Sequence, residues 1–144
     1  MRKIDKIIVH CTDSDDSLDI GFREVNQWHK ERGWLSPSGI SCGYHYIVRR
    51  DGRIESGRPE DEVGAHCKGE NSHSIGISWV GRKQFGSGQY EGLLNKLRDI
   101  CDRYDIGVEQ VYGHFEFDSH KTCPNLSMPH VRAELLFTIG GNKC

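Results

Sequence analysis

The stretch SIGISWV at residues 74–80, followed by YEGLLNKLRDICDRY at residues 90–104, decides the fold class. The first is a short run of the kind that forms a β-strand. In the second, apolar side chains recur at steps of three and four residues, which predicts an amphipathic helix. A strand that leads into a helix of this length is typical of an α/β sheet protein.

The same two patterns recur along the rest of the chain. Arg50-Asp51-Gly52 is a hairpin turn signal, Asp19 and Ser127 are candidate helix caps, and Gly33 is a natural helix stop. The predicted strands are residues 6–10, 43–49, 53–56, 74–80 and 108–112, and the predicted helices are residues 20–32, 90–104 and 127 to about 137. We therefore expect an α/β fold in a single domain over residues 1–144, with a mixed central sheet of about five strands, about three flanking helices and a flexible tail at 140–144.

Charge and hydropathy exclude several classes of protein. The net charge is −2 and no run of Lys or Arg is present, which argues against a nucleic-acid partner. No apolar stretch approaches the ~20 residues needed to span a bilayer, so no membrane partner is expected. The N-terminal residues lack the apolar core of a signal peptide, which predicts synthesis in the cytoplasm. The six cysteines show no CxxC spacing and are interpreted as free thiols plus a metal ligand.

Two of the eight histidines stand at the ends of predicted strands. His10 closes the strand at 6–10 and His114 follows the strand at 108–112, while Cys123 comes shortly afterwards. Ligand sites in α/β sheets gather beyond the carboxyl ends of the strands. Two imidazoles and one thiolate form a zinc site that leaves one position open for water. The alternative interpretation is a pair of strand-end histidines and a buried, inert cysteine.

A series of ordered motifs separates these interpretations. They are IVHCT at 8–12, GYHYIVRRDG at 43–52, VGAH at 63–66, NSHSIG at 71–76, and HFE at 114–116 leading to KTCP at 121–124. Together they resemble the zinc-dependent N-acetylmuramoyl-L-alanine amidases of the amidase-2 family, which includes small phage lysozymes of the amidase type and the peptidoglycan recognition proteins. The resemblance runs from about residue 6 to residue 137.

The resemblance implies a reaction and a set of site residues. The reaction is hydrolysis of the amide bond between N-acetylmuramic acid and L-alanine in peptidoglycan, with one Zn²⁺ per chain held by His10, His114 and Cys123. Catalytic support falls to Tyr44, which would hydrogen-bond the zinc water, and to Lys121, which would stabilise the oxyanion. Substrate contacts fall to His66 and Asn71. We expect a monomer, made in the bacterial cytoplasm and acting on the cell wall after release.

Strand alternation and one departure from the family pattern raise narrower questions. Alternation puts Tyr44 and Tyr46 on one face, with His45 packed on the other, and turns Cys11 away from the metal. The segment before Lys121 is one residue longer than in the small phage amidases, with His120 as the extra residue. Either the loop bulges there, which we favour, or His120 approaches the site. Glu116 either orients a ligand imidazole or lies on the surface.

Two other functions fit the same resemblance. A non-catalytic peptidoglycan-binding module is the first, although non-catalytic members of the family characteristically lack the cysteine that Cys123 supplies here. The second is a secreted antibacterial effector, in place of the phage or prophage endolysin that is expected.

Overall fold

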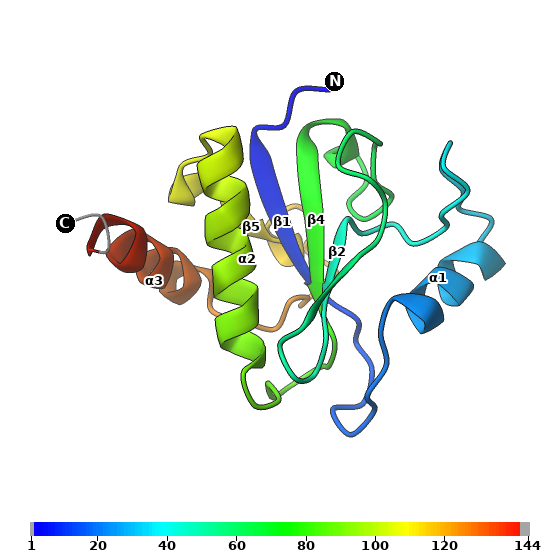
Figure 1. Cartoon of the computed structure of the whole chain (residues 1–144), viewed down its shortest axis with the longest axis horizontal. Coiled ribbons are helices and arrows are strands. Elements are labelled where there is room, and N and C mark those ends of the chain that lie inside the picture. Colours follow the sequence, from blue (N-terminus) through cyan, green and yellow to red (C-terminus); the bar gives the residue numbers. More distant parts are fainter. Residues whose placement is uncertain (1, 142–144) are drawn as a thin grey trace.

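The computed structural model describes residues 2–141, which form a five-stranded mixed sheet with helices packed around it (Figure 1). The strands are β1 (Lys6–Cys11), β2 (Tyr46–Val48), β3 (Ile54–Ser56), β4 (Ser74–Trp79) and β5 (Val111–Gly113). The α-helices are α1 (Phe22–Glu31), α2 (Gln89–Tyr104) and α3 (Met128–Gly141), and the short 3-10 turns are η1 (Asn71–His73), η2 (Val108–Gln110) and η3 (His114–Glu116). The predicted fold class is confirmed.

The strand order β3-β2-β4-β1-β5 places β1 near the middle of the sheet, parallel to both β4 and β5. β2 is parallel to β4, and only β3 runs antiparallel, as the second arm of the predicted hairpin. Because the carboxyl ends of parallel strands meet at one edge, the residues that follow β1 and β5 lie close together. This topology positions the candidate site.

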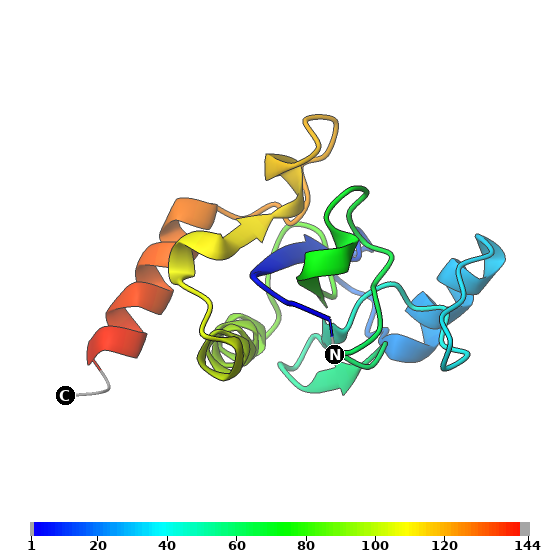
Figure 2. The ribbon, with the colours of Figure 1, turned by 90° about the horizontal axis from the view of Figure 1, so that it is seen from above.

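The main core lies between the sheet and α2. Ile7 and Val9 of β1 join Ile75 and Ile77 of β4 in a buried cluster with the apolar face of α2, which contributes Leu93, Leu94, Leu97, Ile100 and Cys101. Since successive strand side chains point to opposite faces, His10 projects to the other side of the sheet. Figure 2 shows α2 on one side of the sheet and the segment around η3 on the opposite side.

Tyr44 and Tyr46 do not share a face, so that prediction is wrong. Tyr44 packs with the small cluster around Val25 and Cys42, whereas Tyr46 packs against the main core. The regular strand begins only at Tyr46, and alternation breaks at His45. His45 is fully buried, and its Nδ1 accepts a hydrogen bond of 3.0 Å from the Gly76 N–H. This agrees with the packed position expected of it.

The start of α1 also differs from the expectation. Its N-cap is Gly21, because the carboxylate of Asp19 lies 3.2 Å from the guanidinium of Arg49 instead. The side chain of Glu24 accepts a hydrogen bond of 3.1 Å from the Gly21 N–H and completes the helix start.

The last two elements are also displaced from their predicted bounds. η2 occupies the first part of the predicted strand at 108–112, so β5 begins later, at Val111. α3 follows Ser127 as predicted and runs on to Gly141, so residues 140–141 of the predicted tail are helical and residues 142–144 lie outside the described part. Within residues 2–141, no helix combines the length and the hydropathy needed to cross a bilayer.

Candidate active site

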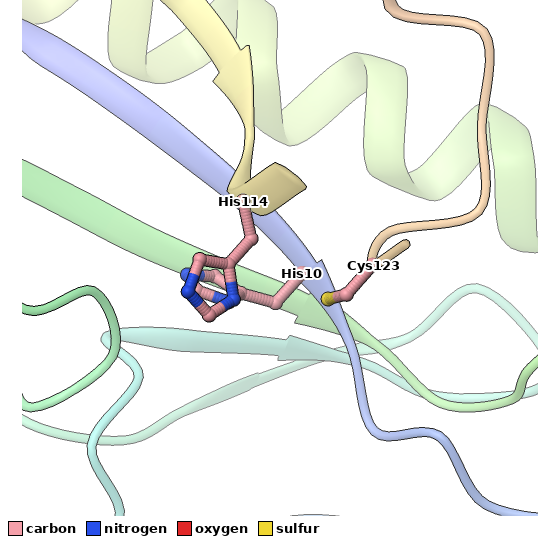
Figure 3. Close-up of side chains that lie close together, drawn as sticks. All are labelled: His10, His114 and Cys123. Atoms are coloured by element: carbon pink, nitrogen blue, oxygen red, sulfur yellow. The ribbon is translucent and has the colours of Figure 1, made fainter. Parts of the chain in front are cut away.

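His10, His114 and Cys123 converge at the carboxyl edge of the sheet (Figure 3). One nitrogen from each imidazole and the Cys123 sulfur all lie within 4.8 Å of one another. His10 is held by β1, His114 starts η3 directly after β5, and Cys123 comes from the loop before α3. The two adjacent parallel strands thus deliver the imidazoles, and the loop returns to supply the thiol.

His10 is the most buried of the three, with 1% of its surface exposed. Its Nε2 lies 2.8 Å from His66 Nδ1, which leaves Nδ1 for another partner. Burial, with the neighbouring imidazoles of His66 and His114, lowers the pKa of His10 well below its usual value. The ring is therefore neutral and offers a lone pair, as a metal ligand must.

His114 is half-buried, and its ring centroid lies 4.5 Å from that of His10. Burial lowers its pKa, and the ammonium of Lys121 acts in the same direction. Glu116 does not face either imidazole: it accepts a hydrogen bond of 2.9 Å from the Gly113 N–H and pairs with Arg132 at 3.0 Å. Glu116 thus lies on the surface, as the second of the two interpretations expected, where its carboxylate stabilises the turn that carries His114.

The sulfur of Cys123 accepts a hydrogen bond of 2.9 Å from the Cys11 N–H. The Cys11 side chain packs in the main core, but its thiol also contacts that of Cys123, so the expectation that it turns away from the metal site is not met. The hydrogen bond with the Cys11 thiol and burial raise the pKa of Cys123. A thiol of this kind ionises beside a divalent cation, and the backbone donor then stabilises the thiolate.

A cavity of about 640 Å³ opens over these three residues. Tyr44 and Lys121 both line it, and the Tyr44 ring centroid lies 5.1 Å from that of His10. Burial raises the pKa of Tyr44, so its hydroxyl stays protonated at neutral pH. The other residues of the lining are Cys11, Thr12, Asp13, His29, Arg32, Trp34, Ala65, His66, His120, Thr122 and Asn125.

The two predicted substrate contacts are placed differently from each other. His66 reaches the cavity lining, but it is only 8% exposed, and its two ring nitrogens contact His10 and Ser74. Asn71 is not part of the lining: its Oδ1 accepts hydrogen bonds of 2.9 Å from the N–H groups of His66 and Cys67. Asn71 therefore holds the loop that carries His66, and nothing in its placement supports a substrate contact.

His120 lies at the rim of the cavity with an exposed side chain and outside the described group of converging ligand atoms. The extra residue is accommodated in a turn closed by Asp118, which accepts hydrogen bonds from the N–H groups of His120 and Lys121. The imidazole therefore stays at the cavity mouth, and the bulge of the loop relative to the small phage amidases stays a prediction.

Three residues at the end of α1 and just beyond it reach the same cavity and were not predicted as site residues: His29, Arg32 and Trp34. His29 was interpreted as helix packing, and it is indeed buried. Its Nδ1 also accepts a hydrogen bond of 2.7 Å from the Gly43 N–H, next to Tyr44. Burial, aided by Arg32, lowers the pKa of His29 to about 4, so the ring acts as a neutral acceptor.

Comparison with known proteins agrees with this geometry. The Amidase_2 family, described as N-acetylmuramoyl-L-alanine amidase, matches residues 1–126. The chain belongs to this family. The endolysin of Escherichia phage T7 is 38% identical over 132 residues, covering 86% of this chain and 82% of that protein. The endolysin of Klebsiella phage KP32 is 36% identical over 135 residues, covering 88% and 84%.

A solved structure of an amidase is also similar. The N-acetylmuramoyl-L-alanine amidase LysC from Clostridium intestinale URNW superposes with a TM-score of 0.80 at 29% identity, covering 93% of this chain and 86% of that one. Family, fold and amidase activity, as predicted from the sequence, are thereby confirmed. Metal binding in this family is typically of zinc, and the residues that converge here fit that metal: two neutral imidazoles and a thiolate are the N and S donors that zinc prefers.

Proposed function

We propose that this amidase is a zinc-dependent endolysin, in which His10, His114 and Cys123 hold one Zn²⁺ per chain. The observation that carries the proposal is the convergence of three ligand atoms within 4.8 Å at the base of an open cavity. Three protein ligands with one open side are typical of catalytic zinc sites, whereas structural sites are closed by four. When bound there, zinc supplies a Lewis acid and lowers the pKa of a coordinated water to ~7.

Tyr44 and Lys121 supply the remaining chemistry in this proposal. The Tyr44 ring lies beside that of His10, and its hydroxyl stays protonated, so it can donate a hydrogen bond to the attacking water and help relay a proton. Lys121 lines the same cavity and is exposed to solvent. It stabilises the negative charge that develops on the lactyl carbonyl oxygen as water adds to the carbonyl carbon, before the bond to L-alanine breaks.

The substrate and the setting follow from the same evidence. The amidase family and the phage endolysins that resemble this chain support peptidoglycan as the partner and the bacterial cell wall as the place of action. We propose further that the protein acts as a monomer, since the ligands and the cavity all come from one chain.

The decisive experiment for the proposed function is mass spectrometry of muropeptides from digested peptidoglycan. New L-alanine amino termini with intact glycan strands are expected from the zinc-loaded protein, and none from Cys123→Ser. Cys67→Ser, which removes a thiol outside the cavity lining, is the matched control and keeps activity. Cleaved glycan, or a cut within the peptide, would overturn the reaction. Peptidoglycan binding without cleavage by the zinc-loaded wild type would revive the binding-module alternative.

A further inference from the structure

Behind the ligand His10 runs a chain of three hydrogen bonds. His10 Nε2 lies 2.8 Å from His66 Nδ1, and His66 Nε2 lies 3.2 Å from Ser74 Oγ. The Ser74 hydroxyl in turn donates to the backbone carbonyl of Glu70 at 2.8 Å. The chain therefore ends on a group that accepts hydrogen bonds and never donates them.

That terminal carbonyl determines where every proton of the chain lies. The single hydroxyl proton of Ser74 is donated to Glu70, so the Ser74 oxygen accepts from His66, and His66 carries its proton on Nε2. A neutral imidazole has only one N–H, so His66 Nδ1 is a bare acceptor. His10 must then donate from Nε2, which leaves the lone pair of His10 on Nδ1.

The surroundings of His66 keep its ring neutral and fixed. The ring is buried against two other imidazoles, with centroids 4.9 Å from His10 and 6.0 Å from His45, and the Arg2 guanidinium lies beyond His45. Burial lowers the pKa of His66 well below its usual value, and His45 acts in the same direction. A side chain at Gly76 would place its Cβ 2.6 Å from this ring. The imidazole therefore occupies space that is free only because residue 76 has no side chain.

We propose that Ser74 and His66 are positioning residues that set the tautomer of His10 and thereby present its Nδ1 lone pair to the metal. The inference rests on the proposed function, in which His10 is a zinc ligand. Partners that hydrogen-bond the free N–H of a ligating histidine fix its tautomer and orientation, and their loss lowers metal affinity by about 10–100-fold. The unusual feature here is that the fixing group is a second histidine, whose own tautomer is set by Ser74.

Long-range ¹H–¹⁵N correlation spectra of the zinc-loaded wild type test the proton positions directly. The expected result is a protonated Nε2 on both His10 and His66, a bare Nδ1 on His66, and a metal-shifted Nδ1 on His10. A proton on His66 Nδ1, or zinc on His10 Nε2, would overturn the inference. No variant is needed for this measurement, so a folding defect cannot obscure it.

Zinc affinity, measured by competition with a chromophoric chelator, tests the consequence. His66→Phe removes the acceptor and is expected to weaken zinc binding by about 10–100-fold, whereas His66→Asn restores an acceptor oxygen and recovers most of the affinity. Ser74→Ala removes the hydroxyl that fixes the tautomer of His66. Mixed tautomers are then expected in the spectrum, and zinc affinity is expected to fall by about 10-fold. The controls are Ser72→Ala and His73→Phe, both exposed and outside the chain of hydrogen bonds.

The outcomes separate this inference from the proposed function. If the wild type binds no zinc, the proposed function fails. If the wild type binds zinc and cleaves peptidoglycan, while His66→Phe and Ser74→Ala keep both the wild-type tautomers and the wild-type zinc affinity, only the positioning role fails.

Discussion

Gly76→Ala tests how the His66 ring packs against β4, and the structure allows its effect on stability to be estimated. The three atoms nearest to an added Cβ all belong to the His66 ring, at 2.6, 2.6 and 2.8 Å. Real Cβ contacts do not approach so closely, and both ring nitrogens are engaged, so the ring has no free direction in which to move. Overpacking of this kind costs ~1–3 kcal/mol of unfolding free energy, which lowers Tm by roughly 3–12 °C.

A double-mutant cycle isolates that contact. In a His66→Ala background the space is empty, and Gly76→Ala then acts only by reducing the entropy of the unfolded chain, which stabilises by ~0.4–1 kcal/mol. The sign of the Gly76→Ala effect is therefore expected to reverse between the two backgrounds in urea or thermal unfolding. Equal destabilisation in both would refute the reasoning, because the clash would then involve something other than His66.

Three further predictions follow from the site. Tyr44→Phe and Lys121→Met are expected to lower kcat by about 10²–10³-fold and to leave zinc affinity unchanged. Lys83→Met, at an exposed position, is the control and is expected to leave kcat unchanged. A large loss of bound zinc in either of the first two variants would contradict the assigned roles. Chelation is expected to abolish hydrolysis and lower Tm, and added zinc to restore both; activity in the fully chelated protein would contradict this. Burial lowers the pKa of His29 and His45 from 6.5 to about 4. The unfolded chain therefore takes up protons first, so unfolding free energy should fall between pH 6.5 and pH 4, and His29→Gln should flatten that slope.

The elements with strong local patterns were predictable from the sequence. α2 and β4 follow from apolar spacing alone, and the strand-end positions of His10 and His114 place them at one edge of a parallel sheet. Cys123 needed the family resemblance, because nothing in its local sequence says that its loop returns to β1. The hydrogen bond from the Cys11 N–H joins residues 112 positions apart in the chain.

The remaining features depend on contacts that local patterns do not encode. Asp19 is a good helix cap by propensity, but its ion pair with Arg49, 30 residues away, leaves the cap to Gly21. His66 was predicted to contact substrate because of the resemblance to the amidase family. Its position next to His10 depends on Gly76, whose missing side chain makes room for the ring. A glycine in the middle of a buried strand was the available signal, since such positions often mark a close approach.

The most direct test of the central claim is zinc K-edge X-ray absorption of the zinc-loaded protein. Ligation by His10, His114 and Cys123 predicts one sulfur at ~2.3 Å, two imidazole nitrogens at ~2.0–2.1 Å and one further light atom. In Cys123→Ser the sulfur shell is expected to vanish, and in Cys67→Ser to remain. A wild-type spectrum with only nitrogen and oxygen neighbours, or a sulfur shell that survives Cys123→Ser, would contradict the account.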